Sequence, residues 1–155
     1  MADKKDILSL TSKELEAIIV SEMSEKKFRA KQIFDWLHVK KVSDFSDMTN
    51  ISADLCTKLD VYFCIICVHI VLKVVFSIDN TVKYLYGLDD GNIVEAVVME
   101  YSFGLSICIS TQIGCKMGCD FCASAIAGFI RNLDSSEILL QKYEAERNLD
   151  RKSVV

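Results

Sequence analysis

Proline is absent from the 155 residues of this chain, and glycine, histidine and tryptophan are scarce, with six, two and one copies. No repeat or low-complexity linker interrupts the sequence. Basic residues are not in excess either, since the chain has 18 Lys and Arg and 22 Asp and Glu, which gives a net charge of −4. That balance argues against nucleic-acid binding by long-range attraction, so any RNA contact must depend on a local cluster.

Long hydrophobic runs are also missing. The longest apolar stretch, Val61–Phe76, is interrupted by His69 and Lys73 and is shorter than the roughly 18 to 20 residues of a membrane span. We interpret it as strand material and expect no membrane partner. Seven cysteines without a charged-then-apolar leader indicate a reducing interior and no disulfide scaffold. The predicted compartment is the cytoplasm.

What is present is enough apolar residues, 51%, to build a core. Residues 1–62 predict a small helical domain. Thr11 and Glu14 form a capping box, a second helix contains Phe28–Leu37, and a third runs from Ser52 to about Tyr62. Basic residues bracket the second helix, which predicts a solvated helix face or an RNA contact. They are Lys26, Lys27, Arg29, Lys31, Lys40 and Lys41.

Residues 63–101 predict a β-rich connecting region. From Val74 to Tyr101, β-branched and aromatic runs are separated by turn signals at Asp79-Asn80 and Asp90-Gly91, as in a hairpin or short meander. Residues 102–155 begin with LSICIST, which predicts a buried strand. A cysteine-rich loop follows, and a helix starts at a second capping box, Asp134 to Glu137. The order strand, loop, helix is that of the first unit of a βα barrel.

Cys115, Cys119 and Cys122 are the main candidates for chemistry. Three thiolates at this spacing can hold an iron–sulfur cluster and leave one iron open, because electron-carrying clusters usually have four such ligands. A zinc site is the alternative, since Cys119 and Cys122 form a CxxC pair. Spacing alone leaves both open, although His38 and His69 are too far upstream to serve as a nearby ligand pair.

The flanks of these cysteines carry a family resemblance. CxxxCxxC with Phe121 before the last cysteine resembles the signature of radical S-adenosylmethionine enzymes. Cys108 in SICISTQIGC, Gly114, Gly118 and the run AGFIRNL resemble the RlmN-type methyltransferases, which act on carbon 2 of adenine in 23S ribosomal RNA and transfer RNA. The resemblance implies an α+β fold in which a helical RNA-binding accessory domain and a β-hairpin or meander precede the first βα unit of a partial (βα)6 barrel.

The resemblance also implies cofactors and residue roles. Cys115, Cys119 and Cys122 would hold a 4Fe-4S cluster whose open iron binds S-adenosyl-L-methionine, with Phe121 near the adenine and an electron donor reducing the cluster. Cys108 would resolve a covalent enzyme–RNA adduct. Glu95 would act as a general acid/base. Without the resemblance, Cys108 reads as a small core residue and Glu95 as an exposed strand residue. Cys56, Cys64 and Cys67 are expected in the core, without function.

These 155 residues cover less than half of the family's length. The family's methyl-carrying C-terminal cysteine and the later barrel strands fall outside them, so we expect this chain to be inactive alone. We also expect the LSICIST strand to lack a neighbour for its backbone groups. The alternatives are a non-catalytic remnant, a metal-binding module that contacts RNA, or another radical enzyme. The oligomeric state and the choice between carbon 2 and carbon 8 are not predicted.

Overall fold

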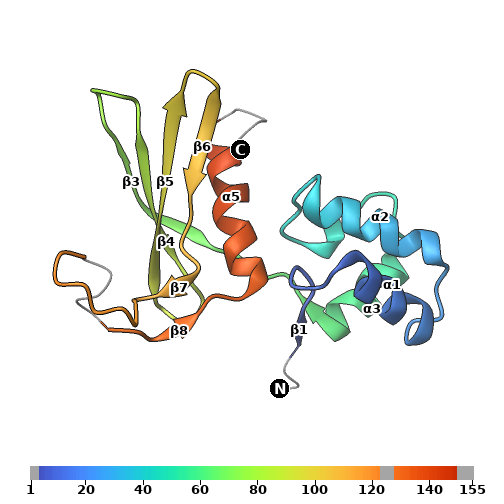
Figure 1. Cartoon of the computed structure of the whole chain (residues 1–155). Helices are drawn as coiled ribbons and strands as arrows, with labels where there is room; N and C mark the ends of the chain where they lie inside the picture. The colour runs from blue at the N-terminus through green and yellow to red at the C-terminus, as the bar shows by residue number, and fades with distance from the viewer. Residues whose placement is uncertain (1–3, 123–127, 150–155) are drawn as a thin grey trace. The chain divides into compact units, whose positions relative to one another are not determined.

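The computed structural model describes residues 4–122 and 128–149 and divides the chain into two compact units, 1–66 and 67–155. Figure 1 labels the elements of both units. None of the helices in the described part of the chain combines the length and apolar character that a bilayer crossing requires.

The first unit is a bundle of short helices closed by a small sheet. Its elements are β1 (Lys5–Asp6), α1 (Ser12–Ser21), α2 (Lys27–His38), the 3-10 helix η1 (Phe45–Asp47), α3 (Ala53–Tyr62) and β2 (Phe63–Cys64). β1 and β2 pair in parallel, so the first and last segments of this unit lie side by side. All three helices predicted from the sequence are confirmed.

Local capping residues start the first and third of these helices. The Thr11 hydroxyl accepts from the backbone N–H of Glu14, whose carboxylate accepts from the backbone N–H of Thr11, so the predicted capping box is complete. Ser52 caps α3 by accepting from the Leu55 backbone N–H. The helices bury one apolar face each against the others. Fully buried members of this core are Leu15, Ile19, Ile33, Leu37, Leu55 and Leu59.

The second unit is a four-stranded antiparallel meander followed by a ribbon and a helix. Its strands are β3 (His69–Val75), β4 (Val82–Gly87), β5 (Ile93–Tyr101) and β6 (Gly104–Cys108), in the spatial order β3-β4-β5-β6. β7 (Gln112–Ile113) and β8 (Arg131–Asn132) form the ribbon, and α5 (Ser135–Leu149) follows. The predicted turns at Asp79-Asn80 and Asp90-Gly91 are confirmed, with Asn80 and Gly91 at positive φ. β3 lies within the stretch Val61–Phe76 that was interpreted as strand material, so that prediction is confirmed over His69–Val75.

The structure corrects the prediction for the LSICIST segment. β6 pairs with β5 from Val97↔Cys108 to Tyr101↔Gly104, so its backbone has a neighbour and is not a lone strand. A tight hairpin through Gly104, at φ +137, makes this pairing possible. β6 is also not a buried strand, because Leu105 is its only buried residue. The last strand of a meander can form its backbone hydrogen bonds with the strand before it. The βα interpretation instead expected a parallel neighbour.

The core of the second unit lies on one face of the meander. Val82, Tyr84 and Tyr86 alternate along β4, and Val94, Ala96 and Val98 face the same way on β5 as their cross-strand partners. α5 lies beside the segment that follows β6 (Figure 1). The buried Gln141 of α5 accepts from the Ser110 backbone N–H at 2.9 Å and donates to the Ser110 carbonyl at 2.9 Å. This amide therefore completes the backbone hydrogen bonding of a segment that has left the sheet.

Candidate functional site

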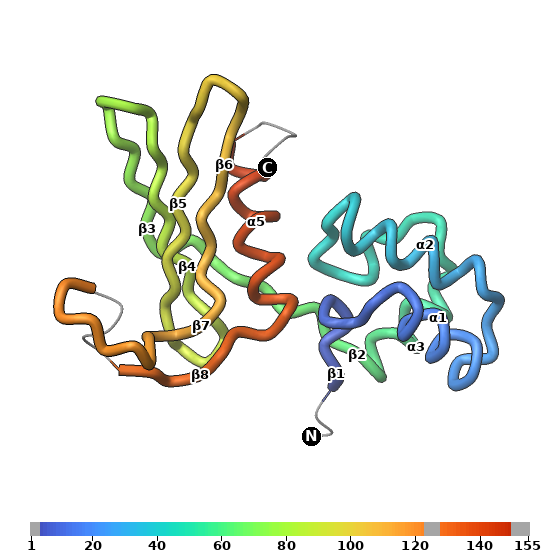
Figure 2. Tube along the Cα trace, in the orientation of Figure 1, coloured from blue at the N-terminus to red at the C-terminus, as the bar shows by residue number. Residues whose placement is uncertain are grey.

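The cysteine loop, residues 114–128, leaves the meander at the end where β4 turns into β5. Figure 2 follows the loop out along β7 and back along β8. The Ile130 N–H donates to the Ile113 carbonyl at 2.9 Å, and the Leu133 N–H donates to the Thr111 carbonyl at 3.0 Å. A meander of four strands brings its odd-numbered turns to one end and its middle turn to the other. The loop therefore shares its end of the sheet with the start of β5.

A hollow of about 590 Å³ lies where the loop meets β5. Glu95, Cys115 and Cys122 line it, together with Ile130 and residues 92–94 and 109–114. Glu95 is exposed and its carboxylate forms an ion pair with Lys83 at 2.6 Å. The Ser110 hydroxyl donates to the Glu95 carbonyl at 2.7 Å. Two of the three predicted metal ligands and the predicted acid/base residue thus share one hollow.

The thiols of Cys115, Cys119 and Cys122 are half-buried, but they do not lie close enough together to bind one metal centre. The Met117 N–H donates to the Cys115 Sγ at 3.5 Å, and the Cys122 N–H donates to the Cys119 carbonyl at 3.1 Å. Within residues 4–122 and 128–149, no three His, Cys, Asp or Glu side chains lie close enough together to hold a metal ion. The donor set fits an iron–sulfur cluster in its chemistry, because thiolates on one glycine-containing loop are its usual ligands.

Two other predicted site residues lie outside the hollow. Cys108 is exposed at the end of β6, opposite Val97, and does not line it. Phe121 is 93% exposed. Residues 123–127 of the loop, which include part of the resembling flank, lie outside the described residues. The roles of Glu95, Cys108 and Phe121 remain predictions.

The sequence pattern did not point to the residue that ties the β7–β8 ribbon, the neck of the cysteine loop, to the rest of this unit. Arg131, to which no role was assigned, forms ion pairs with Asp90 at 2.6 Å and with Glu137 at 2.7 Å. Hydrogen bonds from Arg131 lower the pKa of Glu137 despite its burial. The pKa of Asp90 falls to about 2, chiefly because the Asn92 backbone N–H donates to it and also because of Arg131. An Arg after a loop gives no local signal of a partner 41 residues away.

The remaining cysteines do not all lie where they were predicted. Cys67 is exposed, so its assignment to the core is wrong, and Cys64 is only half-buried at the end of β2. The strand run that should have buried Cys67 is broken between β2 and β3. Although the residue is exposed overall, partial desolvation of its thiol and the nearby Asp89 carboxylate raise the pKa of Cys67.

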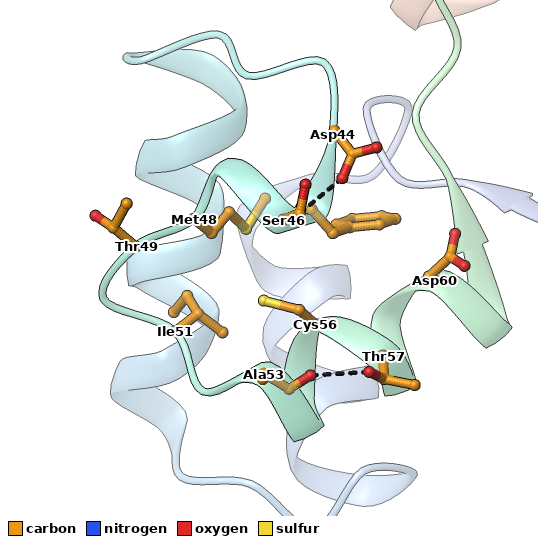
Figure 3. Close-up of a pocket in the computed structure, with 10 residues that line it drawn as sticks. Asp44, Ser46, Met48, Thr49, Ile51, Ala53, Cys56, Thr57 and Asp60 are labelled. Carbon is orange, nitrogen blue, oxygen red and sulfur yellow. Dashed lines mark hydrogen bonds between the residues drawn. The ribbon is translucent and has the colours of Figure 1, made fainter.

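Cys56 lines a separate hollow of about 480 Å³ in the first unit, between η1 and α3 (Figure 3). Burial is the main cause of the raised pKa of its thiol. Asp44 accepts from the Ser46 backbone N–H at 2.7 Å, and the Thr57 hydroxyl donates to the Ala53 carbonyl at 2.9 Å, so polar groups at the rim are engaged in local structure. This lining is that of an ordinary gap between short helices.

Comparison with known proteins identifies the first unit. Residues 5–65 match the family model described as "Ribosomal RNA large subunit methyltransferase N-terminal domain". A protein of Lachnoclostridium phytofermentans named "Probable dual-specificity RNA methyltransferase RlmN" is 50% identical over 147 residues, which are 95% of this chain and 41% of that protein. Its counterpart in Alkaliphilus oremlandii is 51% identical over 139 residues, 90% of this chain and 40% of that protein.

Residues 5–65 thus correspond to an RlmN N-terminal domain, and nearly the whole chain is similar to RlmN proteins. It spans about two-fifths of the length of the curated relatives it matches. A solved structure, described as a radical SAM methyltransferase from Sphaerobacter thermophilus, superimposes with a TM-score of 0.83 at 29% identity and covers 97% of this chain and 45% of that one. RlmN relatives are enzymes, and both units of this chain have counterparts in a methyltransferase. The mixed α+β class is confirmed.

Proposed function

We propose that this chain supplies the RNA-handling domain and the cluster-bearing start of a radical S-adenosylmethionine methyltransferase acting on carbon 2 of adenine in 23S ribosomal RNA and transfer RNA. The observation that carries the proposal is the hollow shared by Cys115, Cys122 and Glu95 in a chain with RlmN relatives. The proposal places the protein in the cytoplasm and requires an electron donor. It also treats residues 102–155 as the entry to a partial (βα)6 barrel.

In this proposal, Cys115, Cys119 and Cys122 hold a 4Fe-4S cluster. When bound, the cluster supplies the electron that cleaves S-adenosyl-L-methionine, which the open iron binds. Glu95 is placed on the wall of the same hollow, where a carboxylate can accept a proton from a base held there. Its ion pair with Lys83 holds the carboxylate in one orientation. Cys108, exposed at the end of β6, is accessible to an RNA adduct.

Anaerobic reconstitution of the chain with iron and sulfide tests the cluster. We expect the optical and EPR spectra of a 4Fe-4S cluster, and a spectral change when S-adenosyl-L-methionine is added. Cys115→Ala, Cys119→Ala and Cys122→Ala should each remove the cluster. Cys56→Ala and Cys67→Ala, outside the loop, should retain it. Stoichiometric zinc with no iron would contradict the proposal and support a zinc-binding module.

The first unit offers a surface for RNA at the start of α2. A hollow of about 720 Å³ is lined by Lys26, Lys27 and Lys31 together with Phe28, whose side chain is half-exposed. Lys27 forms an ion pair with Glu16 at 2.8 Å, whereas Lys26 and Lys31 have exposed side chains that can meet phosphates. Aromatic and basic side chains in one place are typical of single-stranded nucleic-acid contacts.

RNA titrations at several salt concentrations test this surface. Replacing Lys26 and Lys31 by Ala should weaken binding to an RNA hairpin and reduce the slope of log K against log salt by roughly one to two, because each phosphate contact contributes about 0.7 to 0.9. The matched control replaces Lys13 and Lys58, which are exposed lysines on α1 and α3. Equal losses in the two double variants would indicate general charge attraction and no specific surface.

A further inference from the structure

The neck of the cysteine loop is very short. β7 and β8 pair only through Gln112↔Asn132 and Ile113↔Arg131. A two-stranded ribbon is marginally stable in water even when it is longer than this. The neck therefore needs contacts from other elements to hold the loop in one place.

Arg131 supplies these contacts from the returning strand. Its Nε and Nη2 donate to Asp90 Oδ2 at 2.8 and 2.6 Å. Its Nη1 and Nη2 donate to the two carboxylate oxygens of Glu137 at 2.7 and 2.8 Å. Asp90 lies in the turn between β4 and β5, and Glu137 lies in the first turn of α5. One guanidinium therefore joins β8 to the start of α5, six residues later, and to the β4–β5 turn, 41 residues earlier.

The Glu137 arm is the stronger of the two. The Glu137 side chain is 9% exposed, whereas that of Asp90 is 36% exposed and its ion pair is more screened by water. A two-point contact between a guanidinium and a carboxylate also fixes orientation, which a single charge cannot do. Glu137 is held from a second direction, because it accepts from the Asp134 backbone N–H at 2.8 Å.

The segments that Arg131 joins surround the candidate site. The turn containing Asp90 leads directly into residues 92–95, which line the hollow with Cys115 and Cys122. We propose that Arg131 is a positioning residue of the cysteine loop, holding Cys115 and Cys122 at the hollow that Glu95 lines. The inference rests on the proposed function for the identity of the group the cysteines bind, but the placement of the loop can be measured without that group.

Thiol reactivity in the iron-free, reduced 155-residue chain tests the proposal. A pulse of iodoacetamide followed by peptide mass spectrometry gives a rate for each cysteine. In Arg131→Met, we expect Cys115, Cys119 and Cys122 to react at least about threefold faster, because losing charge-assisted hydrogen bonds favours local opening. Cys56 and Cys64, in the other unit, should keep their rates.

Three further variants make this result specific. Lys142→Met removes an ion pair with Glu146 elsewhere on α5 and should leave the loop cysteines unchanged. Asp90→Asn keeps the oxygen that accepts from the Asn92 N–H in the turn and weakens only the ion pair with Arg131. It tests the proposal independently if Arg131→Met does not fold. Arg131→Lys keeps the charge without the two-point contact, so it should give an intermediate rate.

Two results would overturn the proposal. One is an unchanged loop rate in both Arg131→Met and Asp90→Asn. The other is an equal acceleration of all cysteines, which would indicate general destabilisation. Iron reconstitution of the same variants distinguishes failure of the positioning role from failure of the proposed function. A wild-type chain that binds no iron defeats the proposed function, whereas faster alkylation of the loop in Arg131→Met would still support the positioning role.

Discussion

The backbone of Gly114 lies directly against the carbonyl of Gly128. A Cβ on Gly114 would come within 1.6 Å of the Gly128 oxygen, and both residues have positive φ, +71° and +73°. The two ends of the cysteine loop thus close on each other through residues that lack side chains. Lys116 adds to this closure, because its Nζ lies 4.2 Å from the centre of the Phe129 ring.

Gly114→Ala should destabilise the second unit more than Gly118→Ala does. Gly118 also has a positive φ, +63°, but nothing lies within 4 Å of its Cβ position, so that change costs only the backbone strain of about 1 kcal/mol. Gly114→Ala adds a clash with backbone and should cost about 3 kcal/mol in total. Urea unfolding followed by circular dichroism measures both. Equal losses would show that the loop ends do not meet as described.

The stability of the second unit should fall in acid. Arg131 lowers the pKa of Glu137 from its ordinary value of 4.5, and the pKa of Asp90 falls from 3.8 to about 2. The unfolded chain then binds more protons, so the stabilisation is complete above about pH 4.5 and is lost as the pH falls toward 2. Urea unfolding between pH 7 and pH 2.5 measures this loss. Arg131→Met should flatten the profile, and a profile as steep as the wild type would contradict the assignment.

Tyr86→Phe should leave the free energy of unfolding unchanged or raise it by up to about 1 kcal/mol, because a buried hydroxyl without a partner is costly. The hydroxyls of Tyr84 and Tyr86 are buried and have no hydrogen-bond partner within the described ranges. Tyr86→Ala is the contrasting variant. It removes the stacked ring, 5.6 Å from that of Tyr84, and should cost about 3 to 5 kcal/mol. A loss above about 1 kcal/mol in Tyr86→Phe would mean that a buried water bonds the hydroxyl.

Thr11→Ala should destabilise the first unit by about 1 kcal/mol, because it breaks the capping box of α1. Ser21→Ala is a matched control on the same helix. The Ser21 hydroxyl donates only to the Ala17 carbonyl at the exposed end of α1. Its removal should change the free energy of unfolding by less than about 0.5 kcal/mol. Thermal unfolding of the two variants measures the difference, and a Thr11→Ala loss no larger than that of Ser21→Ala would refute the cap.

Local signals in the sequence predicted the helices and turns well. The capping box at Thr11, the start of a helix at Ser52 and the turn at Asp90-Gly91 depend on residues within four positions of one another, and all three are present. In the second predicted capping box, the Glu137 carboxylate accepts from the Asp134 N–H. Such patterns are readable because the groups that satisfy the backbone lie next to it in the chain.

Contacts between distant residues could not be predicted in the same way. Glu137 looked like a capping residue only, yet its carboxylate also binds Arg131. No sequence pattern pointed to Gln141, which is buried against Ser110, 31 residues away. The LSICIST segment was assigned to a βα unit because a loop and a helix follow it, and that order does not reveal its pairing with β5. The family flank identified the loop cysteines, but not the residues that hold the loop in place.

The strand order β3-β4-β5-β6 also has a consequence for the order of folding. Each strand pairs with its immediate predecessor, so every sheet contact is local and the meander can form quickly. The ribosome adds roughly 5 to 20 residues per second, and hairpins form within microseconds. Residues 69–108 can therefore fold during synthesis, before Arg131 and Glu137 have left the ribosome. The surface that receives the cysteine loop is then built before the contacts that fasten the loop to it.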